Sequence, residues 1–345
     1  MNLADLWFII IAVFWTGFFV LEGFDFGVGA IHSVIGRSDT ERRVAINTVG
    51  PFWDGNEVWL VVGAAAIFAA FPAWYATWIS ASYLAIVLLL VALIVRGISF
   101  EWRGRGRGDG WRWGWSLCLT LGSIVAPTVL GIALGDLVAG LPIDSDGNFT
   151  GDFASLFTGL GVWTGLTMLA LCLLQGSTFL ALRTTDAVRG RARRFGHVIG
   201  FVDLAMVAVF GLWMALVAHP GPGGYAVLAV ALLAVLASLI AQFRARDGLA
   251  FSASSIAIAA VVASLFVSLY PNVLVSSTSA SNSLTVAGSA SGDYALSVMS
   301  IVALVCFPIV LLYQAYSYVV FRRRVAGPPP TAEPSTTESA AAAAD

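Results

Sequence analysis

Lysine is absent from this chain of 345 residues, and histidine and cysteine occur only three times each. Charged residues make up 11% of the chain, whereas about 25% is usual in soluble domains. Hydrophobic residues make up 59%, and the mean hydropathy is +0.87. This composition excludes an ordinary soluble globular domain and is typical of a protein that crosses a membrane several times.

The three cysteines, Cys118, Cys172 and Cys306, lie far apart, each within an apolar run. They form neither a CxxC motif nor a spacing that binds metal. We therefore interpret them as inert thiols buried in helices.

Apolar runs of about 20 residues, each long enough to cross a bilayer as a helix, recur along the chain. The polar breaks between them predict nine transmembrane helices, at roughly 5–33, 52–71, 76–100, 114–139, 155–182, 196–218, 224–243, 249–271 and 294–321. No small-residue cleavage site precedes the polar end of the first run, so we expect a retained helix rather than a signal peptide. The sequence thus predicts an all-α integral membrane protein.

Arginines mark alternate connections between the predicted helices. They follow the first, third, fifth, seventh and ninth helices, and the other connections contain none. Seventeen of the eighteen basic residues therefore fall on one side of the membrane. By the positive-inside rule this side is the cytoplasm, which places the N-terminus outside and the C-terminus inside.

The chain is predicted to hold one polytopic membrane domain, residues 1–324, and no extramembrane domain. Residues 325–345 are rich in Pro, Ala, Ser and Thr and cannot bury a core, so a disordered cytoplasmic tail is predicted there. The basic segment RGRGRGDGWRWGW is interpreted as an anchor to anionic lipid, with its tryptophans at the interface, rather than as a nucleic-acid site.

Two pairs of carboxylates lie inside predicted spans, where charged side chains are costly and are functional candidates by default. Glu22 and Asp25, in LEGFDFGVG, are three residues apart and share one face of the first helix. Asp54 and Glu57, in WDGNEVW, repeat this spacing near the start of the second helix. Arg96 is the one basic residue predicted inside a span, on the third helix. All five are expected in the cytoplasmic half of the membrane, because they lie close in sequence to the arginines that follow the first and third helices. Short connections make the three helices neighbours.

These charges have two interpretations. Arg96 neutralises Asp25 or Asp54 and locks three helices together, as buried ion pairs usually do. Alternatively, because one guanidinium cannot neutralise four carboxylates, some of them exchange protons along a path that opens to the cytoplasm.

Three further features belong to the helices. Gly23 and Gly27 form a GxxxG motif, which permits a close helix approach beside the acidic pair of the first helix. Asp203, in the sixth helix, is a weaker and solitary candidate. Asp136 is expected at the outer surface.

None of the three histidines is expected in the middle of the membrane. His32 and His197 fall at inner helix ends, and His219 falls at an outer end. Haem held between helices normally uses histidine or another strong axial ligand at depth. The sequence therefore predicts neither a haem ligand nor a metal site in this chain.

Several segments of the sequence, among them those that hold Asp25, Asp54, Glu57 and Arg96, resemble subunit II of the cytochrome bd quinol oxidase family, which includes cyanide-insensitive relatives. The segments that carry the likeness are GFDFGVG, GRSDTERRVAIN, PFWDGNEVWL, VRGISFEWR, LLQGSTFLALRT, VSSTSASNSLTV and PIVLLYQAYSYVVF. They run from residue 23 to residue 321, so the likeness covers nearly the whole membrane part.

The resemblance implies a heterodimer with a larger subunit I that carries two haems b, one haem d and the quinol-oxidising loop. Quinol oxidation there reduces dioxygen to water, with protons taken from the cytoplasm. The family assigns carboxylates of subunit II to proton entry, and the match falls on Asp25 and Asp54, with Arg96 as the basic neighbour. The position of Glu57 is glutamine in some relatives. The implied partners are subunit I, quinol, membrane lipids and, in some members, a structural quinone; a small accessory subunit is left open.

Two other functions are compatible with the residues. A proton-coupled transporter would bind a substrate cation at the acidic pairs, but it would need broken helices near the midplane and a repeat relating two halves, and the sequence shows neither. A purely structural partner would use the buried charges only as assembly locks.

Overall fold

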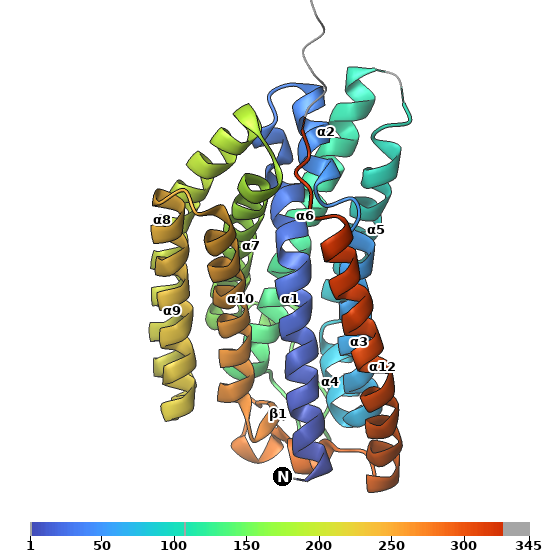
Figure 1. Ribbon diagram of the computed structural model, residues 1–345. Helices are drawn as coiled ribbons and strands as arrows, with labels where there is room; N and C mark the ends of the chain where they lie inside the picture. Colours follow the sequence, from blue (N-terminus) through green and yellow to red (C-terminus); the bar gives the residue numbers. More distant parts are fainter. Residues whose placement is uncertain (1, 107, 327–345) are drawn as a thin grey trace, which may run out of the picture.

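The computed structural model describes residues 2–106 and 108–326, and most of this part of the chain is helical (Figure 1). The helices are α1 (Leu3–Ile35), α2 (Asp39–Asn47), α3 (Trp53–Ala70), α4 (Pro72–Ala81), α5 (Tyr83–Trp102), α6 (Asp109–Ala139), α7 (Gly159–Arg183), α8 (Asp186–Val217), α9 (Pro222–Phe243), α10 (Asp247–Leu269), α11 (Val286–Ser289) and α12 (Asp293–Val320). The short elements are the 3-10 helices η1 (Phe153–Leu156) and η2 (Ala280–Asn282) and the antiparallel strands β1 (Asn272–Leu274) and β2 (Leu284–Thr285). The predicted all-α class is confirmed.

Within the described residues, eight helices are long and apolar enough to cross a membrane: α1, α5, α6, α7, α8, α9, α10 and α12. The second predicted span, residues 52–71, is α3, whose polar first turns set it apart from these eight. The third predicted span, residues 76–100, is divided into α4 and α5 at Ser82. The Ser82 N–H donates to the Trp78 carbonyl at 2.9 Å, and the Ile86 N–H donates to the Ser82 carbonyl at 2.8 Å. Helical hydrogen bonding therefore continues across the division.

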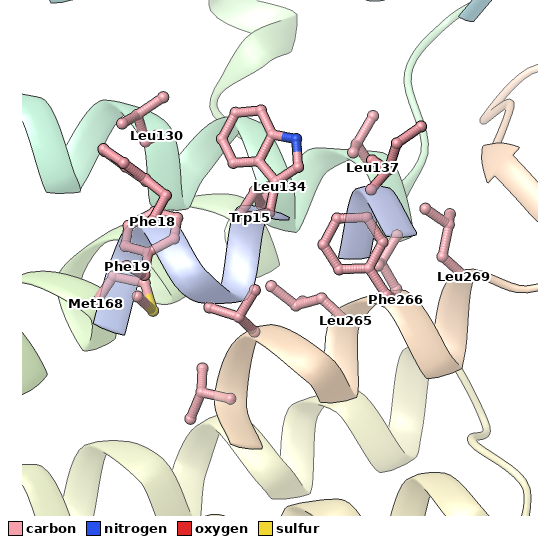
Figure 2. Close-up of a cluster of buried hydrophobic side chains, with 14 of the residues drawn as sticks. Trp15, Phe18, Phe19, Leu130, Leu134, Leu137, Met168, Leu265, Phe266 and Leu269 are labelled. Atoms are coloured by element: carbon pink, nitrogen blue, oxygen red, sulfur yellow. The ribbon is translucent and has the colours of Figure 1, made fainter. Parts of the chain in front are cut away.

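Helix α1 lies at the centre of the bundle (Figure 1). It packs against α3, α6, α7 and α10. Its sequence is apolar on all sides, which suits a helix with neighbours all round. Figure 2 shows its Trp15, Phe18 and Phe19 beside leucines of α6, with α10 close by. The labelled neighbours are Leu130, Leu134 and Leu137 of α6, Met168 of α7, and Leu265, Phe266 and Leu269 of α10.

The backbones of α1 and α7 touch at glycines. A Cβ atom added at Gly27 would lie 1.9 Å from the carbonyl oxygen of Cys172, and one added at Gly176 would lie 2.5 Å from the carbonyl carbon of Gly27. Small residues allow such contact between membrane helices, where dispersion forces rather than the hydrophobic effect hold the helices together. The predicted close approach at Gly23 and Gly27 is confirmed.

The segments that carry the arginines gather at one end of the bundle, drawn at the top of Figure 1. We call this the arginine end. Ion pairs join the ends of α5, α8 and α10 and the short helix α2 there. The pairs are Arg103–Asp39 (2.5 Å), Arg191–Glu41 (2.7 Å), Arg189–Asp247 (2.6 Å) and Arg193–Asp247 (2.8 Å). The connections that carry arginine thus lie together at one end of the bundle, as their alternation along the sequence predicts. The assignment of this end to the cytoplasm stays a prediction.

Helix α2 was not predicted. The Ser38 hydroxyl accepts a hydrogen bond from the Glu41 N–H, and the Glu41 carboxylate accepts one from the Ser38 N–H, each at 3.2 Å. This reciprocal capping box starts a short helix from an S-x-x-E motif that the sequence displays in GRSDTERR. The hydrogen bond from Arg191 to Glu41 also lowers the pKa of that carboxyl group.

The C-terminal end of α12 is bound to the end of α7. The Val325 N–H donates to the Arg183 carbonyl at 2.8 Å, and the Arg183 side chain donates to the Phe321 carbonyl. The tail predicted at residues 325–345 falls outside the described residues from position 327, so its disorder stays a prediction. Val325 itself is hydrogen-bonded to the bundle.

The Gly27 contact yields a test of this packing. We expect Gly27→Ala to destabilise the fold by about 1–3 kcal/mol, because the added methyl group must push α7 away from α1. Gly211→Ala is the matched control, since a Cβ at that helical position meets no atom within 4 Å. Thermal unfolding of the purified proteins measures the difference, and equal melting temperatures would contradict the contact.

Candidate functional site

Four ionisable side chains from three helices meet inside the bundle. Glu22 and Asp25 lie one turn apart on α1, Glu57 lies in the second turn of α3, and Arg96 lies on α5. Glu22, Asp25 and Arg96 have no exposed surface. Residues three apart share a helix face, and this places both acids of α1 toward α3 and α5. We call these four residues the carboxylate cluster.

Arg96 holds the cluster together. Its Nη2 lies 2.6 Å from Glu22 Oε1, and its Nη1 donates to Glu57 Oε1. Its Nε donates to the Ser123 hydroxyl of α6 at 3.2 Å. The guanidinium carbon lies 4.7 Å from the centre of the Phe26 ring, within the range of a cation–π contact. One side chain therefore joins α1, α3, α5 and α6.

Asp25 is held by an amide. Asn56 Nδ2 donates to Asp25 Oδ2 at 2.6 Å and to the Leu21 carbonyl at 2.9 Å. Oδ1 of Asp25 has no hydrogen-bond partner among the described residues. Asn56 was not predicted as a site residue. It lies on the buried face of α3 with Trp59 and Gly63, three and seven residues further on, and this helical spacing is the signal that could have found it.

The predicted partner of the arginine is corrected by the structure. One of the two interpretations of the sequence had Arg96 neutralise Asp25 or Asp54, but Arg96 pairs with Glu22 and Glu57. Asp25 is occupied by an amide, and Asp54 lies one turn nearer the start of α3, where it is exposed. Four of the five predicted residues therefore gather in one cluster, and the fifth lies beside it at the surface.

The cluster holds more acid than base. Three carboxyl groups share one guanidinium, and Glu22 Oε2 and Asp25 Oδ1 have no hydrogen-bond partner among the described residues. A buried ionised carboxylate without compensation is so costly that such a group takes up a proton instead. We therefore expect the cluster to carry at least one proton that can leave and be replaced.

The exposure of the acids is graded. Asp54 is exposed, the side chain of Glu57 is 23% exposed, and that of Glu22 has no exposed surface. Along α1, Glu22 lies about 4.5 Å further from the arginine end than Asp25, at a rise of about 1.5 Å per residue. The exposure of the acids thus falls from Asp54 through Glu57 to Glu22, and Arg96 bridges Glu57 and Glu22.

Two residues of α12 contact Asn56, the residue that holds Asp25 of the cluster. Gln314 Nε2 donates to Asn56 Oδ1 at 2.7 Å, and the Tyr318 hydroxyl donates to the same oxygen at 3.4 Å. Both lie in the segment PIVLLYQAYSYVVF, whose polar side chains within an apolar run were the available signal. The sequence did not show which helix face they occupy.

Two other carboxylates lie apart from the cluster. Asp203 is fully buried on α8, and neither of its carboxyl oxygens has a hydrogen-bond partner among the described residues. Asp136 was expected at the outer surface, and this is wrong, since it is 2% exposed. It accepts a hydrogen bond from the hydroxyl of Thr158 at 2.6 Å, and Thr158 is the N-cap of α7, so the start of that helix covers it.

Of the three histidines, His32 is engaged within its own helix, whereas Nε2 of His197 is buried and has no hydrogen-bond partner among the described residues. His32 Nδ1 lies 2.7 Å from the Gly29 carbonyl oxygen, and its Nε2 lies 3.0 Å from the Ser33 hydroxyl. Across residues 2–106 and 108–326, no group of three His, Cys, Asp or Glu side chains is arranged to hold a metal ion.

A bundle of helices that are long and apolar enough to cross a membrane belongs to the class of polytopic integral membrane proteins, and ionisable side chains buried within such a bundle are functional candidates by default. The family model described as cytochrome bd terminal oxidase subunit II matches residues 3–321. The chain belongs to this family.

Individual relatives agree with this assignment. Cytochrome bd ubiquinol oxidase subunit 2 of Bacillus subtilis is 42% identical over 332 residues, which are 94% of this chain and 97% of that protein. Cytochrome bd-I ubiquinol oxidase subunit 2 of Escherichia coli K12 is 32% identical, over 92% of this chain and 93% of that protein. The fold matches a chain in the structure of bd oxidase from Geobacillus thermodenitrificans, with a TM-score of 0.72, 20% identity, and coverage of 93% and 98%.

The resemblance read from the sequence segments is therefore confirmed. The chain is a subunit of a cytochrome bd terminal oxidase, an oxidoreductase of the respiratory chain. It is a multi-pass protein of the bacterial plasma membrane.

The buried guanidinium yields a second test. We expect Arg96→Leu to destabilise the protein by about 3–5 kcal/mol, because it leaves two glutamates buried without a partner. Arg105→Leu, at a side chain that is 66% exposed, should change stability by less than about 0.5 kcal/mol. The yield and the thermal unfolding midpoint of both variants are the measurements. Similar values for the two would show that the cluster does not depend on Arg96.

Proposed function

We propose that this chain is a haem-free accessory subunit of a cytochrome bd-type quinol oxidase, that it provides a proton-entry path from the cytoplasm, and that it stabilises the haem-bearing subunit I. The relatives in B. subtilis and E. coli are named as ubiquinol oxidase subunits, which supports quinol as the electron donor. The observation that carries the proposal is the carboxylate cluster, which has three acids, one base and a graded exposure.

The chemistry of the oxidase requires such a path. Reduction of dioxygen to water consumes one proton for each electron, and these protons must cross part of an apolar membrane protein. Carboxyl groups within hydrogen-bonding reach of one another or of bridging water can pass protons in steps. In this chain Asp54 collects protons at the surface, Glu57 is the first acid with a buried part, and Glu22 and Asp25 hold protons at depth.

Arg96 keeps this path in place and in electrostatic balance. Its two ion pairs fix the carboxylates of α1 and α3 at a common centre, and its permanent charge favours the ionised form of whichever acid has just lost a proton. Asp25 lies next to this centre without an ion pair of its own. It is therefore the member best suited to exchange its proton.

Subunit I is the proposed site of the redox chemistry. Haem b and haem d bound there would supply electron transfer and dioxygen reduction. His32 is unsuited to bind haem, since both of its ring nitrogens are engaged within α1. A heterodimer is accordingly the proposed assembly, and α12, on which only Leu296 is fully buried, leaves a long apolar surface for other parts of the complex or for lipid.

The cytoplasmic opening of the path rests on the arginine end. Asp54 and Glu57 lie in the first turns of α3, which follows the arginine-bearing helix α2 directly. The positive-inside rule assigns this end to the cytoplasm. Protons entering beside Asp54 would therefore come from the cytoplasmic side.

Asp25→Asn tests the role of the cluster. The change keeps the size and polarity of the side chain but removes its exchangeable proton, so we expect quinol-driven oxygen consumption to fall at least about tenfold. Asp54→Asn should reduce the rate by a smaller factor, because Glu57 is partly exposed. Asp109→Asn, at an exposed position of the same end, is the control and should leave the rate unchanged.

The visible spectrum of the purified complex separates the possible outcomes. Normal haem absorbance with a low rate supports proton entry through the cluster. A normal rate in Asp25→Asn would remove this role, and loss of the haem absorbance together with the protein would favour an assembly lock. A colourless single polypeptide from the unaltered chain would instead favour a transporter.

A further inference from the structure

The amide of Asn56 uses all of its hydrogen-bonding capacity. Its Nδ2 donates to Asp25 and to the Leu21 carbonyl, and its Oδ1 accepts from Gln314 and Tyr318. A primary amide has two N–H donors and one oxygen with two lone pairs, so every position is filled. Asn56 has no proton to pass on, and its task in the cluster is to hold a neighbour.

The orientation of this amide decides what it presents to Asp25. In the observed orientation Nδ2 points at the carboxyl group and Oδ1 points at α12. A rotation by half a turn would exchange the two and place the Asn56 oxygen against the Asp25 oxygen, a contact between two acceptors. Three further hydrogen bonds oppose this rotation: the one from Nδ2 to the Leu21 carbonyl at 2.9 Å, and those that Oδ1 accepts from Gln314 at 2.7 Å and from Tyr318 at 3.4 Å. The bond from Gln314 is the shortest of the three.

Helix α12 is tied to the rest of the bundle at both ends. At its start, the Ser291 N–H donates to the Ala70 carbonyl at the end of α3, at 2.8 Å. At its end, Val325 and Phe321 are bonded to Arg183 of α7. Between these ends little of α12 is buried in the described chain. Trp7 Nε1 of α1 donates to Leu296 and Ser300 in the first turns of α12, and the contacts of Gln314 and Tyr318 with Asn56 lie nearer its other end.

Tyr318 adds a rigid contact of its own. Its ring stacks on Phe52, with ring centres 4.7 Å apart and an angle of 18° between the planes, and it packs edge-on against Phe24 at 6.3 Å. Phe52 directly precedes α3 and Phe24 precedes Asp25. The aromatic packing therefore fixes the register of α12 against the two helices that carry the amide and the acid.

We propose that Gln314 and Tyr318 of α12 are positioning residues that act through Asn56 to hold the Asp25 carboxyl group in the orientation in which it exchanges protons. The inference rests on the proposed proton-entry function and extends it to a helix that contributes no acid. Asn56 then holds the Asp25 carboxyl group, and the hydrogen bonds from α12 fix the orientation of the Asn56 amide. The remaining Asp25 oxygen, Oδ1, stays open to the proton donor or acceptor.

The test uses the full oxidase complex with substitutions in this chain. Gln314→Met removes the donor at similar side-chain length, and Tyr318→Phe removes only the hydroxyl and keeps the stacked ring. Tyr316→Phe is the matched control, since it makes the same change at a residue of α12 that is 67% exposed. Each variant is measured for haem absorbance and for kcat and KM of quinol-driven oxygen consumption.

We expect Gln314→Met to assemble with normal haem absorbance and to lose about tenfold in kcat, because a misdirected carboxyl group slows each proton transfer. The KM for quinol should stay unchanged, since the proposed site of quinol oxidation lies on subunit I. Tyr318→Phe should lose a smaller factor in kcat, as its hydrogen bond is longer, and Tyr316→Phe should match the unaltered complex. A merely structural role would not lower kcat in an intact complex while leaving KM unchanged.

The outcomes distinguish this inference from the function on which it rests. If Asp25→Asn is slow while Gln314→Met and Tyr318→Phe turn over at the normal rate, the positioning role is refuted and the proton path stands. If Asp25→Asn itself turns over normally, the proton path is refuted and the positioning role with it. If Gln314→Met does not assemble, Tyr318→Phe decides: a lowered kcat supports the inference, and a normal kcat overturns it.

Discussion

A single buried guanidinium organises this molecule. Arg96 has no exposed surface and pairs with two glutamates on two other helices, so α1, α3 and α5 can adopt only registers that bring these three side chains together. An unpaired charge in this place would cost several kcal/mol. The same interaction leaves the cluster with more acid than base, because Arg96 pairs with Glu22 and Glu57, and Asp25 receives a hydrogen bond from the neutral Asn56 instead. The packing of these helices and the proton transfer that we propose for them thus depend on one residue.

The rest of the fold serves to keep α1 in the centre. Glycine contacts bring α7 against one side of it, and aromatic residues fill the space toward α6 and α10. Helix α12 lies on the outside and is held by its ends, yet its Gln314 reaches the buried amide of α3. The carboxylate cluster is therefore supported by contacts from elements that carry no acid, and its geometry depends on helices distant in sequence.

Much of the fold could be predicted from the sequence, because apolar runs and arginine placement report directly on solvation in a bilayer. Most helix ends were located to within about five residues, but α8 begins at Asp186, ten residues before the predicted start at 196, Ser82 divides one predicted helix, and α2 was missed despite its capping box. The five candidate residues were chosen by the same logic, since an ionisable side chain in an apolar run is conspicuous. The ion-pair partners of Arg96 could not be predicted, because helix rotation and tilt decide whether its side chain meets Glu22 or Asp25. For the same reason the neutral partners Asn56 and Gln314 were missed.

Proton uptake during a single turnover tests the central claim most directly. The fully reduced complex is mixed with oxygen, and the disappearance of protons from the medium is followed with a pH-sensitive dye while haem oxidation is followed by absorbance. If the carboxylate cluster is the entry path, Asp25→Asn will slow proton uptake at least about tenfold, and the first step of haem oxidation will remain fast. Proton uptake at the normal rate in that variant would show that protons enter elsewhere and would contradict this account.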